Sequence, residues 1–173
     1  LISTVQADEI DVIKSVGDFS KGTAEARAAS DALVKGGSRN LLPLLKAFNG
    51  SSVLASNWLR STFETIADAE IKSGGSLPKD DLLKFVKTTS ESPAARRLAY
   101  EWLLKRSPQL EDQLIPGILQ DPSPEFRRDA VNRLLKVAET ATGDDAKAAY
   151  RNALKGAVHE DQVKKIAKAL RDA

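Results

Sequence analysis

Apolar residues recur at helical spacing along most of this chain. Three stretches share an arginine, an alanine two residues later and a leucine six residues later, and they begin at Arg27, Arg97 and Arg128. A weaker copy of the same pattern begins at Asn57. The four starts are separated by roughly 30 to 40 residues, a spacing typical of helical-repeat proteins. The pattern therefore predicts an array of similar helix pairs.

Glycine, proline and hydroxyl residues divide the chain into about ten predicted helices. Gly36-Gly37 is expected to end one helix, and Ser123-Pro124 to start another with a hydroxyl cap. No stretch alternates with period two for long enough to indicate a strand. The predicted fold class is all-α: a right-handed superhelix, or solenoid, of about five antiparallel helix hairpins over residues 1–173 as one segment.

Two helix starts and two prolines refine this prediction. Thr23 and Ser52 are expected to cap the helices that follow them, because their hydroxyls can accept from free backbone amides. Pro43 and Pro116 fall inside predicted first helices of hairpins. A proline in a helix interior removes a backbone hydrogen bond, so both are expected to bend their helices.

Composition narrows the chemistry without naming a function. The 173 residues include 42% apolar and 29% charged side chains, and the net charge is +2, so no strong overall field favours nucleic acid or an anionic membrane. The chain has no cysteine, which excludes disulfides and thiolate metal sites, and no cofactor is predicted. It also has no methionine, so we expect it to be part of a longer protein.

The direction of each side chain divides the repeated pattern in two. At 100° per residue, the alanine and leucine point to the core side of the helix, and the arginine points away from it. One turn later, Asp31, Ser61, Glu101 and Asn132 share the outward direction. These positions predict a polar ladder that binds a partner: Arg27, Asn57, Arg97, Glu101, Arg128 and Asn132. The alternative is a solvated face held by weak ion pairs four residues apart.

Four further residues have both structural and functional interpretations. Trp58 and Trp102 fall on the flanks of their helices, where packing between repeats is one role and anchoring a partner is the other. Asp121 is expected to cap amides and to pair with Arg127, rather than to act as a catalytic acid. His159 is the only histidine, so the chain lacks the other residues that a multi-histidine zinc site or a catalytic triad would need. His159 is therefore expected to be a solvated residue at the start of a helix.

The residues around one turn resemble the HEAT repeat. That family pairs a first helix bearing Leu-Leu-Pro with an Asp-Pro turn and a second helix that opens with arginine and alanine, and residues 114–130 match it nearly throughout. Residues 41–45 resemble the first helix, and residues 26–29 and 95–99 resemble the second. Because Arg96-Arg97 and Arg127-Arg128 are doublets, either arginine of each could fill the family position. The resemblance implies an α-solenoid used for protein contacts.

We therefore expect a non-enzymatic protein-binding or scaffolding module whose partner is another protein or a neighbouring domain of the same chain. Two alternatives stay open: a nucleic-acid-binding protein, since some HEAT-like bacterial proteins are DNA glycosylases, and a structural spacer between domains. No membrane association is predicted. The overall style also resembles helical segments of large bacterial multidomain proteins that are often exported. An exported or periplasmic location is therefore favoured over a cytoplasmic one.

Overall fold

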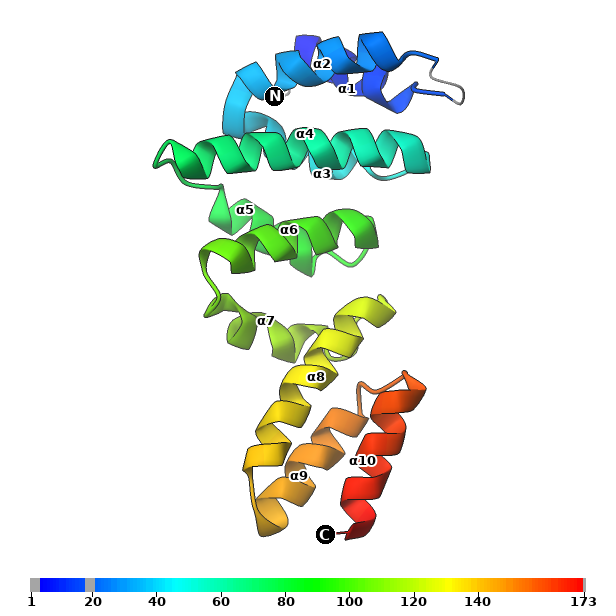
Figure 1. Ribbon diagram of the computed structural model, residues 1–173, viewed down its shortest axis with the longest axis vertical. Helices are drawn as coiled ribbons and strands as arrows, with labels where there is room; N and C mark the ends of the chain where they lie inside the picture. The colour runs from blue at the N-terminus through cyan, green and yellow to red at the C-terminus, as the bar shows by residue number, and fades with distance from the viewer. Residues whose placement is uncertain (1–3, 18–20, 173) are drawn as a thin grey trace. The chain divides into compact units, whose positions relative to one another are not determined.

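The computed structural model of the protein describes residues 4–17 and 21–172, and these form helices and no strand. The prediction of an all-α protein is therefore confirmed. The elements are α1 (Thr4–Lys14), α2 (Thr23–Gly36), the 3-10 helix η1 (Gly37–Asn40), α3 (Leu41–Ala47), α4 (Val53–Lys72), α5 (Lys79–Lys87), α6 (Pro93–Arg106), α7 (Leu110–Ile118), α8 (Pro124–Thr140), α9 (Gly143–Leu154) and α10 (Glu160–Asp172) (Figure 1).

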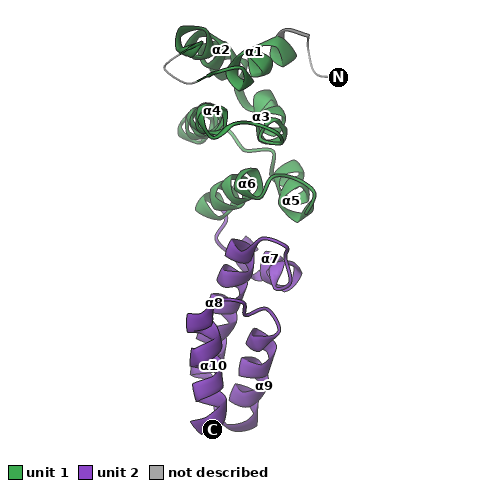
Figure 2. Ribbon diagram, turned by 90° about the vertical axis from the view of Figure 1, so that its right-hand side faces the viewer, with its two compact units in different colours: residues 1–106 green, residues 107–173 purple. Residues whose placement is uncertain are grey.

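The helices group into two compact units, residues 1–106 and residues 107–173. We call them unit 1, which contains α1 to α6, and unit 2, which contains α7 to α10 (Figure 2). The single five-hairpin solenoid over residues 1–173 stays a prediction.

Unit 1 is built from the helix pairs α1–α2, α3–α4 and α5–α6. The second helices of these pairs pack on one another, α2 on α4 and α4 on α6, and they form one layer of the unit. The first helices form the other layer (Figures 1 and 2). Such stacking buries the apolar face that each pair would otherwise expose. It leaves the opposite face of α2, α4 and α6 available at the surface.

The alanine and leucine positions of the repeated pattern form the core of unit 1. All are less than 7% exposed, as predicted: Ala29, Leu33, Leu59, Phe63, Ala99 and Leu103. Between the first two pairs, the hydroxyls of Ser30 and Thr62 share a hydrogen bond of 2.7 Å. The sequence pattern therefore identified the buried side of these helices correctly.

Unit 2 is organised around α8, which packs against α7, α9 and α10. Ala130 of the last repeated pattern is fully buried, and Leu134 is only partly buried against the core cluster of the unit. Gly156 lies after α9 at a close approach to α7, where an added Cβ would be 2.5 Å from the Leu119 carbonyl oxygen. Only glycine leaves room for these two chain segments at that distance. The core cluster consists of Val131, Leu135, Ala153 and Ile166.

Helix starts agree only in part with the expected caps. The Ser52 side chain caps α4 by accepting a hydrogen bond from the Ala55 amide at 3.1 Å, as predicted. The prediction for Thr23 was wrong, because Gly22 is the N-cap of α2 in the left-handed conformation, at φ 76°. The hydroxyl of Ser123 does not cap α8 either. Gly37 ends α2 at the positive φ of 70° that favours glycine, but its ψ of −157° differs from the left-handed helical conformation that was predicted.

The two prolines also differ in their places. Pro116 lies inside α7, as expected. Pro43 lies in the first turn of α3, after the 3-10 helix that ends at Asn40, so it is not in a helix interior. A proline at this position cannot donate to the carbonyl four residues earlier. The bend predicted for a proline in a helix interior therefore does not apply to Pro43.

Candidate binding groove

The residues predicted to form a polar ladder all lie on second helices: Arg27 on α2, Asn57 on α4, Arg97 and Glu101 on α6, and Arg128 and Asn132 on α8. Arg27, Asn57, Glu101 and Asn132 are exposed, and the two remaining arginines are partly buried. Their predicted outward direction is therefore largely correct. Whether they bind a partner stays a prediction.

In unit 1, the ladder residues of α6 pair with each other. The Arg97 Nε donates a hydrogen bond of 2.8 Å to Glu101 Oε1, and the guanidinium also lies 5.5 Å from the centre of the Tyr100 ring. The ion pair joins residues four apart on one helix, as expected for an exposed face. It leaves Glu101 about half exposed, at 47% of its side-chain surface.

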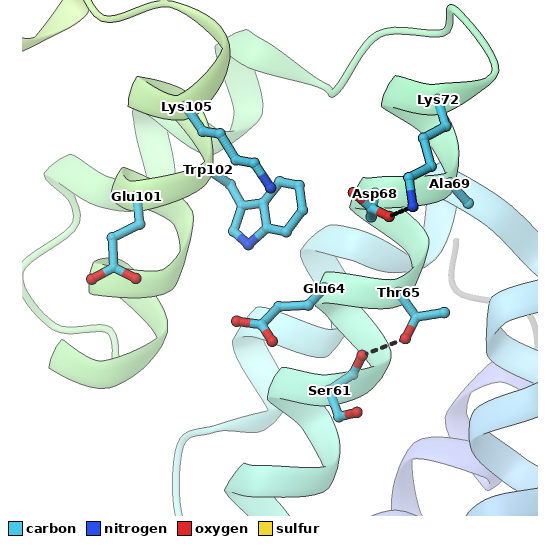
Figure 3. Close-up of a pocket in the computed structure, with 9 residues that line it drawn as sticks. All are labelled: Ser61, Glu64, Thr65, Asp68, Ala69, Lys72, Glu101, Trp102 and Lys105. Carbon is cyan, nitrogen blue, oxygen red and sulfur yellow. Dashed lines mark hydrogen bonds and ion pairs between the residues drawn. The ribbon is translucent and has the colours of Figure 1, made fainter.

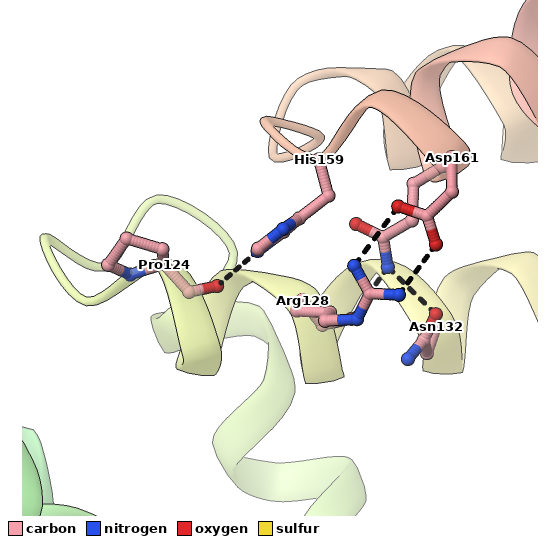
Figure 4. Close-up of polar contacts among 6 residues, drawn as sticks. Pro124, Arg128, Asn132, His159 and Asp161 are labelled. Atoms are coloured by element: carbon pink, nitrogen blue, oxygen red, sulfur yellow. Dashed lines mark hydrogen bonds and ion pairs between the residues drawn. The ribbon is translucent and has the colours of Figure 1, made fainter.

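In unit 2, the ladder residues bond to another helix (Figure 4). The Arg128 guanidinium donates two hydrogen bonds, of 3.0 and 2.5 Å, to the Asp161 carboxylate in the first turn of α10. The amide of Gln162, which is 3% exposed, donates to the Arg128 carbonyl oxygen and to Asn132 Oδ1. At these positions the outward side of α8 is therefore hydrogen-bonded to α10, which differs from the exposed polar ladder that was predicted.

A groove of about 760 Å³ lies between α4 and α6 in unit 1 (Figure 3). Its volume is within the range of known ligand sites. Two positions of the predicted outward face, Ser61 and Glu101, line it. Arg27, Asn57 and Arg97 are outside the lining. The full lining is Ser61, Glu64, Thr65, Asp68, Ala69, Lys72, Glu101, Trp102 and Lys105.

Most of the residues on the α4 wall of this groove were not predicted from the sequence. The residues after Ser61 continue the same helical face for three further turns, to Lys72, at steps of three and four. The prediction used only the arginine position and the position one turn later. Continuing the outward stripe along this 20-residue helix would have found Glu64 and Asp68.

Trp102 forms the aromatic part of the groove. Its side of α6 faces α4, where its ring meets Phe63 edge to face, with 6.4 Å between ring centres and 73° between planes. It is 8% exposed, so the packing role between repeats is confirmed for this tryptophan. The Lys105 ammonium lies 4.0 Å from the centre of the Trp102 ring, a cation–π contact (Figure 3).

Two ion pairs lie along α4, the other wall of the groove. Lys72 pairs with Asp68 at 2.5 Å, and Arg60, which is outside the lining, pairs with Glu64 at 3.7 Å. The hydrogen bond from Lys72 lowers the pKa of the Asp68 carboxyl below its ordinary value of 3.8, and the charges of Lys72 and Lys105 lower it further. Asp68 is thus a carboxylate at neutral pH and is influenced by cations from both walls of the groove.

Each arginine doublet divides into two roles. The first arginine bonds to backbone: Arg96 Nε donates to the Val86 carbonyl oxygen at 2.8 Å, and Arg127 Nε donates to that of Gly156 at 3.1 Å. The second pairs with a carboxylate, as described above. Successive helical residues point 100° apart, so one can reach inward while the next stays at the surface. Arg96 is 1% exposed, and sequence analysis did not predict this burial.

Asp121 and His159 are both placed by backbone contacts. Asp121 is 3% exposed, and its Oδ1 accepts from the Ser123 amide at 2.9 Å, which supports the predicted capping role. His159 directly precedes α10, as predicted, but it is partly buried. Its Nε2 lies 3.2 Å from the Pro124 carbonyl oxygen, so it contacts the start of α8 (Figure 4).

Comparisons with models of known protein families, with characterised proteins and with solved structures find no match. Within residues 4–17 and 21–172, no three histidine, cysteine, aspartate or glutamate side chains are grouped so that they could hold a metal ion. Over the same residues, no helix combines the length and the apolar composition that crossing a membrane requires.

Proposed function

We propose that this protein is a non-enzymatic helical-repeat module that binds another protein in the groove between α4 and α6. The observation that carries the proposal is the groove itself, of about 760 Å³, which is lined by Trp102 and by polar side chains on both walls. Aromatic residues in a pocket with a polar rim are typical of protein-binding sites.

The packing of unit 1 supports a binding role for this surface. The core of α4 and α6 is supplied by the opposite side of each helix, through residues such as Leu59 and Ala99, which are fully buried. Apart from Trp102, which packs on Phe63, the exposed groove positions can therefore vary without loss of the fold. Solenoid proteins use the surface of stacked helices in this way.

We also propose that the five hairpins belong to one HEAT-like solenoid. The support is that α2, α4 and α6 bury both equivalent positions, that α8 buries the alanine position and part of the leucine position, and that all four carry arginine or asparagine at the equivalent outward position. In such an array each repeat stabilises its neighbours. A destabilising substitution in unit 2 would then also accelerate amide hydrogen exchange in α6.

The groove is tested by selecting binders from a random-peptide library displayed on phage. Ala69 is exposed and lines the groove, so Ala69→Arg fills it without disturbing the core. We expect selected peptides to bind the unmodified protein and to lose at least about ten-fold in affinity for Ala69→Arg, which corresponds to about 1.4 kcal/mol.

Ala28→Arg is the matched control, because it places the same side chain at an exposed position on α2 outside the groove lining. It is expected to bind the selected peptides as well as the unmodified protein does. If no selected peptide distinguishes Ala69→Arg from Ala28→Arg, the groove is not a protein-binding site and the proposal is wrong.

A further inference from the structure

The chemistry of the groove indicates what kind of partner it accepts, provided that it is the binding site proposed above. The face of the Trp102 ring already holds a cation, the Lys105 ammonium at 4.0 Å. Aromatic faces attract cations through the negative charge above the ring plane, and tryptophan does so most strongly. The protein therefore places its own ammonium where a cationic group of a partner would gain the same contact.

The walls of the groove carry three carboxylates, on Glu64, Asp68 and Glu101, and two ammonium groups, on Lys72 and Lys105. Both ammonium groups are engaged, one with Asp68 and one with the Trp102 ring. The residues that line the groove therefore carry one more negative than positive charge, while Arg60 and Arg97, which pair with Glu64 and Glu101, are outside the lining. The lining carboxylates and the cation site on the Trp102 ring are complementary to a cationic partner that replaces these pairs, and a polyanion is not complementary to them.

The carboxylates are available for exchange. Their partners are basic residues four positions away on the same helix, and the three carboxylate side chains are 42 to 47% exposed. Exposed pairs of this kind contribute only tenths of a kcal/mol. A cationic side chain from a partner can replace them at little cost.

The length of the groove indicates a peptide rather than a small amine. Its α4 wall extends from Ser61 to Lys72, about three helical turns, or roughly 16 Å at 1.5 Å per residue. An extended chain covers this distance with about five residues. Two or three of their side chains would point into the groove together.

We propose that the groove between α4 and α6 binds an extended basic peptide segment of a protein partner. One lysine or arginine of the peptide replaces the Lys105 ammonium on the Trp102 ring, and neighbouring cationic side chains pair with Glu64 and Glu101. Lys105 is thus a resident competitor that the peptide displaces.

The test uses fluorescence anisotropy with labelled peptides of alternating arginine and serine, alternating glutamate and serine, or glycine and serine, in about 0.1 M salt, where charges beyond roughly 10 Å are screened. The basic peptide is expected to bind, and the other two are not. Lys105→Gln is expected to tighten binding several-fold. Lys79→Gln is the control, because it removes the same charge at an exposed position of α5 outside the groove lining.

Glu64→Gln combined with Glu101→Gln is expected to weaken binding about ten-fold or more. Its control is Asp144→Asn with Asp145→Asn, which changes net charge equally on exposed residues of α9. The inference is overturned if Lys105→Gln binds no more tightly than Lys79→Gln, or if both double variants behave alike. Circular dichroism of each variant verifies that it is folded.

Different experimental results would overturn this inference and the proposed function. Phage-selected or acidic peptides that Ala69→Arg blocks, without a preference for basic sequences, would overturn the basic partner and leave a protein-binding groove. Binding of a labelled single-stranded oligonucleotide that Ala69→Arg blocks would overturn both. Binding of the basic peptide alone, tightened by Lys105→Gln, supports both.

Discussion

The second helices α6 and α8 carry polar residues at equivalent repeat positions, yet they use them in opposite ways. On α6, Glu101 lines the groove beside Trp102. On α8, Arg128 and Asn132 bond to Asp161 and Gln162 of α10. The same outward face lines a groove in unit 1 and bonds to another helix in unit 2. An outward direction in a repeat is therefore not enough to indicate a partner site.

The arginine doublets extend this comparison to the backbone. Arg96 and Arg127 occupy equivalent positions, and each bonds to a carbonyl oxygen at the end of a neighbouring segment. They differ in burial, since Arg96 is 1% exposed and Arg127 is only partly buried. Burial should therefore decide how much each bond contributes to stability.

The largest effect is expected for Arg96→Ala. Removing this side chain leaves a cavity and takes a donor from the buried Val86 carbonyl oxygen, a loss of about 3 kcal/mol. Arg127→Ala should cost about 1 kcal/mol, because Arg127 and its hydrogen bond are only partly buried, so its removal leaves a smaller cavity. Urea unfolding followed by circular dichroism measures both values.

Arg97→Ala is the control for this pair. It removes a surface ion pair with Glu101 and should cost less than about 1 kcal/mol. If Arg96→Ala and Arg127→Ala lower the free energy of unfolding equally, burial does not explain how much each hydrogen bond contributes.

Gly156→Ala is expected to have the next largest effect and to act on unit 2. The added methyl would be 2.3 Å from Leu119 Cδ1 and 2.5 Å from the Leu119 carbonyl oxygen, so the chain must move. Overpacking of this kind costs about 1 to 3 kcal/mol. Thermal unfolding of the variant measures the loss.

Gly117→Ala provides the matched control, since an added Cβ there meets no atom within 4 Å. It lies inside α7, where alanine is favoured over glycine by up to about 1 kcal/mol. A Gly117→Ala variant that is less stable than Gly156→Ala would show that the close approach to α7 is not what restricts residue 156.

The smallest effect is expected for the ion pair between Arg128 and Asp161, which joins α8 to α10, and this effect depends on pH. The hydrogen bonds from Arg128 lower the pKa of Asp161 below its ordinary value of 3.8 in the folded protein. The pair therefore stabilises the fold above about pH 4, and this contribution is lost as pH falls through the lowered pKa. Asp161→Asn should lower the unfolding temperature at pH 7 and have little effect near pH 2.

Asp145→Asn is the control, because it also removes an exposed carboxylate from the first turn of a helix, α9. The difference between the two variants isolates the pair with Arg128 from the interaction with the helix dipole. If Asp161→Asn and Asp145→Asn give the same change at pH 7, the ion pair does not stabilise unit 2.

The periodicity of the chain predicted the helices and their buried sides well. Leu33, Phe63 and Leu103 are core residues because helical spacing places them on one side, whatever the neighbouring chain does. Caps were less predictable. Ser52 caps α4, whereas α2 begins after Gly22, because several residues near a helix start can satisfy the same amides.

The groove could be predicted only in part. Ser61 and Glu101 were placed on the outward face from their register, but Trp102 had two possible roles until its contact with Phe63 was known. The burial of Arg96 was equally open, since the doublet offered either arginine. Such choices depend on which helix lies opposite, and that information is not local.

Local spacing and the positions of glycine and proline were enough to predict an all-α chain and the buried sides of α2, α4 and α6. Only the tertiary contacts reveal that α4 and α6 leave a groove lined by Trp102, whereas Asp161 and Gln162 of α10 bond to Arg128 and Asn132 on α8. The surroundings of an outward side chain depend on the helix that packs beside it, and that helix is distant in the sequence.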